Sequence, residues 1–365
     1  MNEPRRLTVA VTGLNARADN PGPGLAVVRC LRESAELGGF DLRIVGLSYD
    51  ALDPGLYHPG CDAAYLLGYP FEGSAALAER LRHIHAKERL DAIIPCLDAE
   101  LPNFTQLQTE LQSWGIRSFL PSTRQLQMRD KSRLVELAKL AGIAAPETKL
   151  IHDASFFHTC ERLGWSYPIV VKGLYYDAQV CGDATTAIAA FNRIGSTWGM
   201  PLIVQRVIKG EEYNLAGIGD GFGKLLGPVM MKKRALTDKG KAWAGVTVHD
   251  ERLLATAESI VRHLGWRGAL EVEVMRDDTG TYHLIEINPR FPAWIYLSAG
   301  VGRNLPAALL RLIVGAALPT FPPVPTGTLF IRYAEEVIVS MAQFEAMMLT
   351  NTRASEELIP KEIAA

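Results

Sequence analysis

Cysteine is scarce in this chain, and its few cysteines are scattered. They occupy Cys30, Cys61, Cys96, Cys160 and Cys181 and never form a CxxC pair. This spacing argues against a disulfide framework and against a cysteine-based zinc site. We therefore expect a protein of the reducing cytoplasm.

A surplus of positive charge is also missing. The chain has 38 lysine and arginine residues against 40 aspartate and glutamate residues, which gives a formal net charge of −2. A balanced surface offers no general attraction for a nucleic-acid backbone or an anionic membrane. We expect neither nucleic acid nor membrane as a partner.

Long hydrophobic runs and a dinucleotide fingerprint are absent as well. The apolar run from Leu7 to Val11 is too short for a signal peptide, and the most apolar late segment, residues 305–319, is interrupted by Arg311 and bounded by prolines. The loop from Thr12 to Gly24 contains glycines but not the GxGxxG spacing. These absences disfavour a membrane span and a dehydrogenase.

The length of 365 residues predicts two or three domains, and the first is readable from its pattern. Residues 1–120 alternate short apolar strands with helical stretches, which predicts βαβ units and a parallel sheet. One strand ends in IIPCLDAE, so Asp98 and Glu100 lie at the strand end where open sheets often bind ligands.

A second unit begins near residue 121. DKSRLVELAKLAG, residues 130–142, has a helical apolar stripe, and residues 150–206 again alternate strand, helix and strand. Glycine-punctuated strands and a helix over 250–264 follow, and a strand and an amphipathic helix near 340–349 precede the C-terminus. We expect a small lobe over about 150–206.

The segment ALEVEVMRDDTGTYHLIEINPR, residues 269–290, predicts a β-hairpin. A two-residue turn at Thr279-Gly280 would place Glu273 opposite Glu286, whereas a three-residue turn would shift the register by one. Glu271 and Glu273 share one face of their strand in either case, as do Glu286 and Asn288.

Two interpretations of this acidic patch remain open. It is either a solvated strand face or the oxygen-ligand site of a hard divalent cation. Like charges on opposed strands need compensation, and Mg²⁺ typically binds one or two carboxylates together with substrate phosphates. Arg290, just beyond the proline, would then reach a phosphate oxygen.

Two lysines and a polar hinge add to the cation hypothesis, although each also has an ordinary structural explanation. Lys172 ends the apolar strand YPIVVK, where it is either salt-bridged or ligand-binding, and Lys131 begins the helix at 130–142. PLIVQRVIKGEEYN contains Gln205 at the end of a strand, followed by two acidic residues. This segment is either an ordinary turn or a segment that binds a nucleotide.

Taken together, these segments resemble the ATP-grasp superfamily, and in particular its carbamoyl-phosphate-synthase-like branch of carboxylate–amine ligases. The matching stretches are DKSRLVELAKLAGIAAPET, YPIVVKG, LIVQRVIKGEEYNL and EVEVMRDDTGTYHLIEINPR. The resemblance implies an α/β and α+β fold: a Rossmann-like pre-ATP-grasp domain over 1–120, a two-lobed ATP-grasp domain over 121–330 and a strand-and-helix extension over 331–365.

The resemblance also implies roles for individual residues. Lys131 and Lys172 match the phosphate-binding lysines, and Arg290 matches the arginine that steadies the transferred phosphoryl group. The remaining matches are Gln205, Val207 and Ile208 beside the adenine, Glu212 on the ribose, and Glu273, Glu286 and Asn288 as metal ligands. Arg234 is a candidate for the substrate carboxylate or the transferred phosphate, against the alternative of a solvated basic run.

The implied reaction is the ATP-dependent activation of a carboxylate as an acyl phosphate, which an amine or similar nucleophile then attacks. The implied cofactors are ATP and Mg²⁺, with Mn²⁺ as the alternative ion, and the substrates are small-molecule or peptide carboxylates and amines. Homodimers are common among relatives. Biotin-dependent carboxylation is a weaker variant because no biotinyl-carrier segment is seen.

One departure supports a competing hypothesis of a non-catalytic ATP-binding subunit or regulator. The family usually has a glycine-rich lid after the second lysine, whereas this chain has GLYYDAQVCGD at residues 173–183. Against that hypothesis, a degenerate site would have little reason to retain Glu273, Glu286, Asn288 and Arg290 together.

Overall fold

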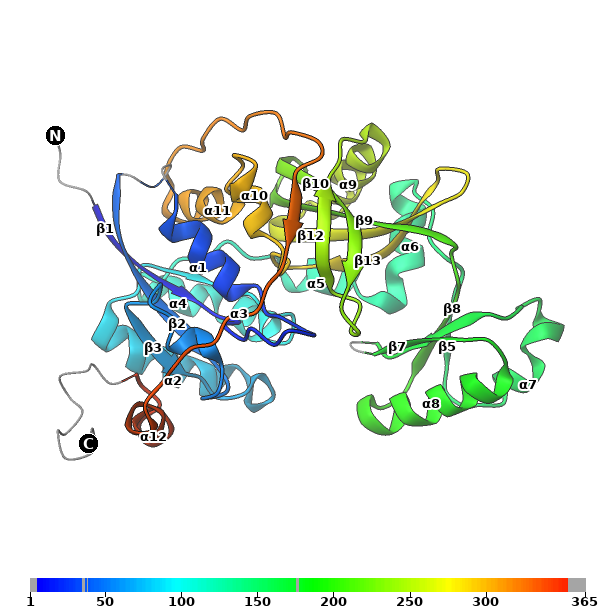
Figure 1. Cartoon of the computed structure of the whole chain (residues 1–365), viewed down its shortest axis with the longest axis horizontal. Coiled ribbons are helices and arrows are strands. Elements are labelled where there is room, and N and C mark those ends of the chain that lie inside the picture. Colours follow the sequence, from blue (N-terminus) through cyan, green and yellow to red (C-terminus); the bar gives the residue numbers. More distant parts are fainter. Residues whose placement is uncertain (1–4, 35–36, 38, 175–176, 354–365) are drawn as a thin grey trace.

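The structure, a computed structural model, describes residues 5–34, 37, 39–174 and 177–353. Its strands form three sheets, and the segments that connect them bring the sheets together around a central six-stranded sheet (Figure 1). The expected mixture of a parallel sheet and a two-lobed α+β unit is confirmed.

The N-terminal sheet is parallel and has the strand order β3-β2-β1-β4. Its strands are β1 (Arg5–Val11), β2 (Phe40–Ser48), β3 (Ala63–Leu66) and β4 (Ala92–Ile94). The helical segments of this region are α1 (Gly24–Arg32), η2 (Pro54–Leu56), η3 (Pro70–Glu72), α2 (Gly73–Glu88), α3 (Leu101–Gln106) and α4 (Gln108–Ser113). Because the strands are parallel, their carboxyl ends share one edge, which faces the rest of the molecule in Figure 1.

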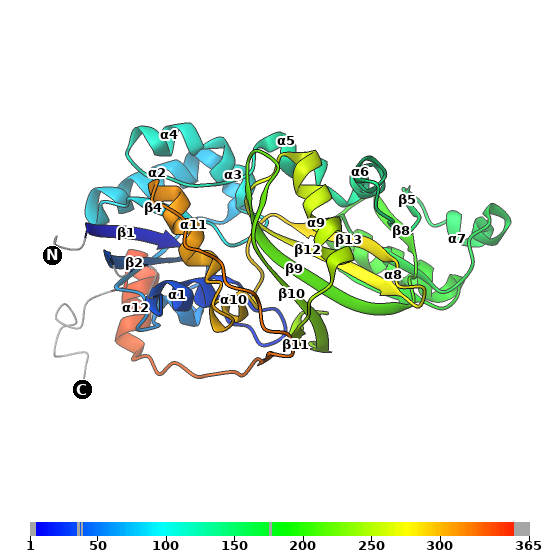
Figure 2. The same cartoon turned by 90° about the horizontal axis from the view of Figure 1, so that it is seen from above.

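The small lobe is an antiparallel sheet with the order β5-β8-β6-β7. Its elements are β5 (Thr148–Ile151), α7 (Phe156–Thr159), η5 (Cys160–Leu163), β6 (Ile169–Lys172), β7 (Ala178–Cys181), α8 (Ala184–Trp198) and β8 (Leu202–Arg206). Ala187, Ala190, Phe191 and Ile194 form the buried stripe of α8, which packs against β6. The lobe projects away from the central sheet (Figure 2).

The central sheet is covered on one face by α6 and α9 and on the other by α10 and α11. Its order is β13-β12-β9-β10-β11-β14. The strands are β9 (Gly210–Asp220), β10 (Leu225–Leu236), β11 (Ala242–Thr247), β12 (Arg267–Asp277), β13 (Tyr282–Asn288) and β14 (Leu329–Ile331). The helical segments are α5 (Thr123–Met128), η4 (Lys131–Arg133), α6 (Leu134–Ala141), α9 (Glu251–Leu264), α10 (Tyr296–Gly300) and α11 (Leu305–Val314).

Strand β12 alternates between these two faces. Leu270, Val272 and Val274 belong to the core beneath α6 and α9, whereas Ala269 belongs to the core beneath α10 and α11. Since side chains alternate along a strand, Glu271 and Glu273 share the face of Ala269. The acidic residues are therefore directed away from α6 and α9.

The C-terminal segment returns from the central sheet to the N-terminal sheet. After β14 pairs with β11, the chain leads to α12 (Met341–Thr350), whose Met347 is fully buried beside Leu56 and Ala64. A bridge between Tyr65 and Thr352 fixes this contact. The ranges 1–120, 121–330 and 331–365 remain predictions as domain boundaries. Within the described part of the chain, no helix has the length and apolar character needed to cross a membrane.

Candidate functional site

The predicted hairpin is present, and its register at the acidic residues is the one that places Glu273 opposite Glu286. The register also pairs Glu271 with Asn288. The turn itself differs from the two-residue turn considered in the sequence, because Asp277 N–H donates to Thr281 O (3.0 Å) across three residues.

A β-bulge explains how the register survives the longer turn. Glu273 pairs with Glu286, but the next residue, Val274, pairs with Leu284, so Ile285 has no partner opposite it. This extra residue compensates for the one-residue shift that a three-residue turn introduces. The bulge therefore lies directly beside the two opposed carboxylates.

Glu271 is the buried centre of a hydrogen-bond network. Its carboxylate accepts bonds from Asn214 Nδ2 (2.7 Å), Trp294 Nε1 (2.7 Å) and Asn288 Nδ2 (2.9 Å). Burial and the charge of Glu273 raise the pKa of Glu271, against the opposing effect of Arg290. Because its lone pairs are occupied by these donors, Glu271 positions Asn288 rather than a ligand.

Glu273 is held as an anion by a lysine from the neighbouring strand β10. Lys233 Nζ lies 3.1 Å from Glu273 Oε2 and 2.8 Å from Glu212 Oε2. Burial alone would raise the pKa of Glu273, but Lys233 and Lys241 lower it to about 2. Lys233 retains its proton, since the two glutamates outweigh its burial and raise its pKa.

Two lysines from different elements surround Glu286. Lys131 Nζ lies 3.2 Å from Glu286 Oε1, and Lys172 is only 8% exposed. Burial and the nearby charge of Lys131 lower the pKa of Lys172 to about 8, although Glu286 and Glu273 oppose this shift. Lys172 makes no ion pair with another residue of the described chain, so it is an ammonium available to an anion.

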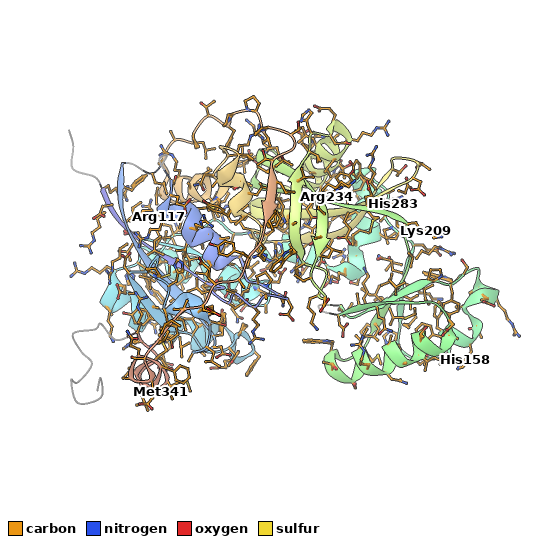
Figure 3. All side chains as sticks on the ribbon, in the orientation of Figure 1. Arg117, His158, Lys209, Arg234, His283 and Met341 are labelled. Carbon is orange, nitrogen blue, oxygen red and sulfur yellow. The ribbon has the colours of Figure 1, made fainter. Side chains whose placement is uncertain are left out.

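The hinge between the small lobe and the central sheet contains a side chain that is hydrogen-bonded within the described part of the chain, Gln205, and backbone groups that are not. Gln205 is buried, and its Nε2 donates to Thr148 Oγ1 over 2.9 Å. Val207 and Ile208 lie between β8 and β9, and their peptide groups hydrogen-bond no other described residue. Lys209, on the same connection, is labelled in Figure 3.

Arg290 connects the acidic cluster to the N-terminal sheet. Its Nε donates to Asp98 Oδ2 (2.8 Å), and its Nη1 lies 3.5 Å from Glu271 Oε2. Burial opposes the charge of Arg290, but Asp98 and Glu271 outweigh it and raise its pKa. Arg129 also pairs with Asp98 (3.4 Å), so the strand-end carboxylate noted in the sequence holds two arginines.

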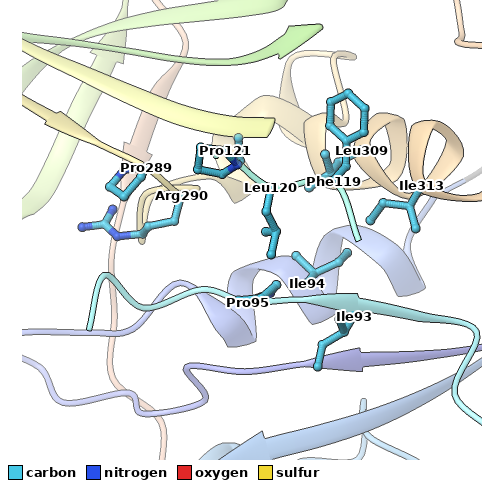
Figure 4. Close-up of a pocket in the computed structure, with 11 residues that line it drawn as sticks. Ile93, Ile94, Pro95, Phe119, Leu120, Pro121, Pro289, Arg290, Leu309 and Ile313 are labelled. Carbon is cyan, nitrogen blue, oxygen red and sulfur yellow. The ribbon is translucent and has the colours of Figure 1, made fainter. Parts of the chain in front are cut away.

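The pocket beside Arg290 is mostly apolar and does not form part of the charged site. Residues of β4, the segment 119–121 and α11 line it, including Ile94, Leu120 and Leu309 (Figure 4). The guanidinium of Arg290 lies at its edge in this view.

The basic run on β10 contributes Lys233 to the acidic cluster, whereas the sequence had indicated Arg234. Arg234, labelled in Figure 3, is exposed at a bulge of β10, and no ion pair joins it to another described residue. Lys233 instead pairs with Glu273 of the acidic cluster. The role of Arg234 remains a prediction. In the sequence, only the alternation of side chains along MMKKR could have indicated that Lys233 faces the acidic residues. The bulge interrupts this alternation and therefore obscures the indication.

The aromatic residues after the hairpin serve the core and the network. Phe291 is 1% exposed within the core beneath α10 and α11, and Trp294 bonds Glu271. The expected lid, residues 173–183, contains a connection of five residues between β6 and β7, closed by Gly173 N–H donating to Asp177 O (3.1 Å). Tyr175 and Tyr176 of this lid lie outside the described residues.

The donor set fits a hard divalent cation bound together with an anionic ligand. Glu273 and Glu286 supply carboxylate oxygens, and Asn288 has its nitrogen committed to Glu271 and Glu273, which leaves its carbonyl oxygen for a cation. No group of three or more His, Cys, Asp or Glu side chains in the described ranges is arranged to hold a metal alone. Oxygen ligands from a bound substrate would complete such a site.

Comparison with known proteins identifies relatives of the sequence and the fold. Residues 199–336 match the family described as "ATP-grasp in the biosynthetic pathway with Ter operon". A D-alanine–D-alanine ligase of Chromohalobacter salexigens is 24% identical over 175 residues, which cover 44% of this chain and 54% of the ligase. The chain spans about half the length of the curated relatives that it matches.

Two solved structures share the fold at low identity. Biotin carboxylase from Campylobacter jejuni, in complex with β,γ-ATP, has a TM-score of 0.67 at 18% identity and covers 88% of this chain and 74% of its own. The L-amino acid ligase from Bacillus licheniformis has a TM-score of 0.62 at 16% identity, with coverages of 86% and 75%.

Proposed function

Because the chain belongs to the ATP-grasp superfamily, we propose that it is an ATP-dependent ligase, which activates a carboxylate as an acyl phosphate and joins it to an amine or similar nucleophile. ADP and phosphate are the other products. The observation that carries the proposal is the pair of opposed carboxylates, Glu273 and Glu286, neutralised by Lys233 and Lys131 beside the available ammonium of Lys172.

The nucleotide would lie at the junction of the two lobes. The open peptide groups of Val207 and Ile208 are suited to the polar edge of adenine, with Gln205 beside them, and Glu212 is the candidate for the ribose hydroxyls. Lys131 and Lys172 would neutralise the phosphates, since both ammonium groups are near Glu286.

Mg²⁺, with Mn²⁺ as the alternative, would be held by Glu273, Glu286 and Asn288. When bound, the ion supplies charge neutralisation for the phosphates. Lys233 lowers the pKa of Glu273 and so keeps this carboxylate ionised and ready to act as a ligand, while Lys131 pairs with Glu286. The cost of opposing two carboxylates across the hairpin supports a ligand-binding role over a merely solvated strand face.

Arg290 is proposed to stabilise charge on the transferred phosphoryl group. Its pairing with Asp98 and Glu271 fixes its orientation and maintains its positive charge. Preorganised positive groups of this kind lower the barrier to phosphoryl transfer without a covalent enzyme intermediate. Arg234, which is exposed on β10, would contact the substrate carboxylate or the transferred phosphate.

The names of the relatives suggest the substrate class. D-alanine–D-alanine ligases and an L-amino acid ligase act on amino acids, so we propose an amino acid or small peptide as the carboxylate or the amine. A homodimer remains part of the proposal; a biotin carboxylase domain of the same fold is a dimer in its solved structure.

A non-catalytic nucleotide-binding role is the second candidate. The observation in its favour is the five-residue connection between β6 and β7, which is short for a cover over phosphates. The two candidates make different predictions, because a binding subunit would bind MgATP without releasing ADP.

The test is an ADP-release assay with MgATP and a panel of amino acids and amines, accompanied by calorimetric titration of MgATP. We expect ADP release that requires both a carboxylate and an amine, and a loss of at least about 100-fold in Glu286→Gln. Turnover equal to wild type in this variant, or no MgATP binding, would refute the ligase. Binding without turnover across the panel would favour the non-catalytic role.

A further inference from the structure

The carboxyl edge of the N-terminal sheet carries a stack of three aromatic rings that the proposed chemistry does not use. The rings of Tyr49 and Tyr69 have centroids 6.1 Å apart, and those of Tyr69 and Phe71 are 5.7 Å apart and nearly parallel, at 8°. Tyr69 is 48% exposed and Phe71 is 86% exposed. An ordered aromatic surface is thus presented to solvent.

The inner end of this aromatic stack (Tyr49, Tyr69 and Phe71) is anchored to a fully buried carboxyl group. Glu100 accepts hydrogen bonds from the hydroxyls of Tyr49 and Thr12 and from the backbone N–H groups of Cys96 (2.8 Å) and Leu97 (2.9 Å). These partners follow the ends of β2, β1 and β4. Glu100 therefore ties three strand ends together and fixes the Tyr49 ring.

The outer end of the stack is held by hydrogen bonds to the backbone of Tyr69 and Pro70. Tyr69 N–H donates to Glu72 Oε1 (2.7 Å), and Asn103 Nδ2 of α3 donates to Pro70 O (2.8 Å). These bonds fix η3 and with it the position of Phe71. The exposed rings are thus preorganised, which lowers the entropic cost of binding a ligand.

The aromatic stack is continuous with the candidate site through one loop. Asp98, which binds Arg290, and Glu100, which binds Tyr49, are two residues apart, so their Cα atoms are within roughly 7 Å of each other. The stack and Arg290 are therefore attached to the same short segment. The edge on which they lie is where open α/β sheets bind ligands.

We propose that the aromatic stack is an acceptor subsite that binds an aromatic or similarly planar apolar group of the amine substrate. The role as an acceptor subsite rests on the proposed ligase function. A flat ring fits because Phe71 offers an open face parallel to Tyr69, and offset stacking of one more ring extends the existing arrangement. Continuity with Arg290 would direct the attached amine toward the activated carboxylate.

The experiment measures binding of two amines that differ by one ring, L-phenylalaninamide and L-alaninamide, by calorimetric titration. We expect the wild type to bind L-phenylalaninamide about 10-fold more tightly, and Phe71→Ala to reduce this preference by about 3- to 10-fold. Phe71 is exposed, so folding does not depend on it. Phe222→Ala is the matched control, because Phe222 is a 95% exposed phenylalanine on the turn between β9 and β10.

Equal affinity for the two amines, or the same loss in Phe222→Ala, would overturn the subsite. Sedimentation would overturn it as well if wild type formed a dimer that Phe71→Ala dissociates, because the stack would then be an interface between copies. A Phe71-dependent preference without ADP release from any acceptor would support the subsite and refute the ligase, so the two failures are distinguishable.

Discussion

Asn288 and Glu271 face each other across β12 and β13, and Asn288 Nδ2 donates to Glu271 Oε2 over 2.9 Å and to Glu273 Oε1 over 2.8 Å. One amide group therefore connects a buried structural carboxyl to a carboxylate at the site. This arrangement assigns different positions to two glutamates of a single acidic strand, since Glu271 sets the orientation of Asn288 and Glu273 is the proposed cation ligand.

The first prediction concerns Glu271→Gln. The new amide nitrogen would replace one carboxylate oxygen and would face either Asn214 and Trp294 or Asn288, all of which are donors. We therefore expect a loss of about 2 kcal/mol in the free energy of unfolding, measured in urea. Glu286→Gln is the control, because its side chain is 27% exposed and should alter MgATP affinity much more than stability. Equal stability of the two variants would contradict the structural role of Glu271.

The second prediction compares two adjacent lysines. Lys233→Met leaves Glu212 and Glu273 without their shared buried cation, so we expect a stability loss of about 3 kcal/mol. Lys232→Met removes a surface pair with Glu211, worth about 0.5 kcal/mol or less, and a long cation–π contact with Tyr213 (5.9 Å). Urea unfolding of both variants measures the difference, and similar losses would exclude a special role for Lys233.

The third prediction is a pH dependence of nucleotide binding. The pKa of Lys172 is lowered to about 8, so its ammonium is present below pH 8 and is lost as the pH rises through this value. MgATP affinity should therefore fall above pH 8, because a neutral amine does not attract phosphate. Titrations between pH 7 and pH 9.5 measure this, and Lys172→Arg should bind with a flatter profile since arginine retains its charge.

The fourth prediction tests Arg234. Its side chain is exposed and forms no ion pair within the described chain, so Arg234→Ala should change stability by less than about 0.5 kcal/mol. If Arg234 contacts substrate, KM for the carboxylate should rise about 10-fold while KM for ATP stays constant. An unchanged KM for the carboxylate would leave this arginine as a solvated surface residue.

Local patterns of the sequence were sufficient for much of this fold. Alternating strands and helices predicted the parallel sheet, and the hairpin parity predicted which acidic residues share a face. Even so, the expected register arises in a different way, since a three-residue turn is compensated by the bulge at Ile285. A bulge depends on packing on both sides of the strand, which a sequence pattern does not record.

The sequence by itself determined the local elements and the order in which the charged motifs follow one another, because periodicity and turn residues depend on near neighbours in the chain. Only the tertiary structure decided that Lys233 rather than Arg234 enters the acidic cluster, and that Asp98 reaches Arg290. It also decided that α12 packs beside Leu56, far from the strand that precedes it. Each of these contacts joins elements distant in sequence, and burial and charge compensation in three dimensions select them.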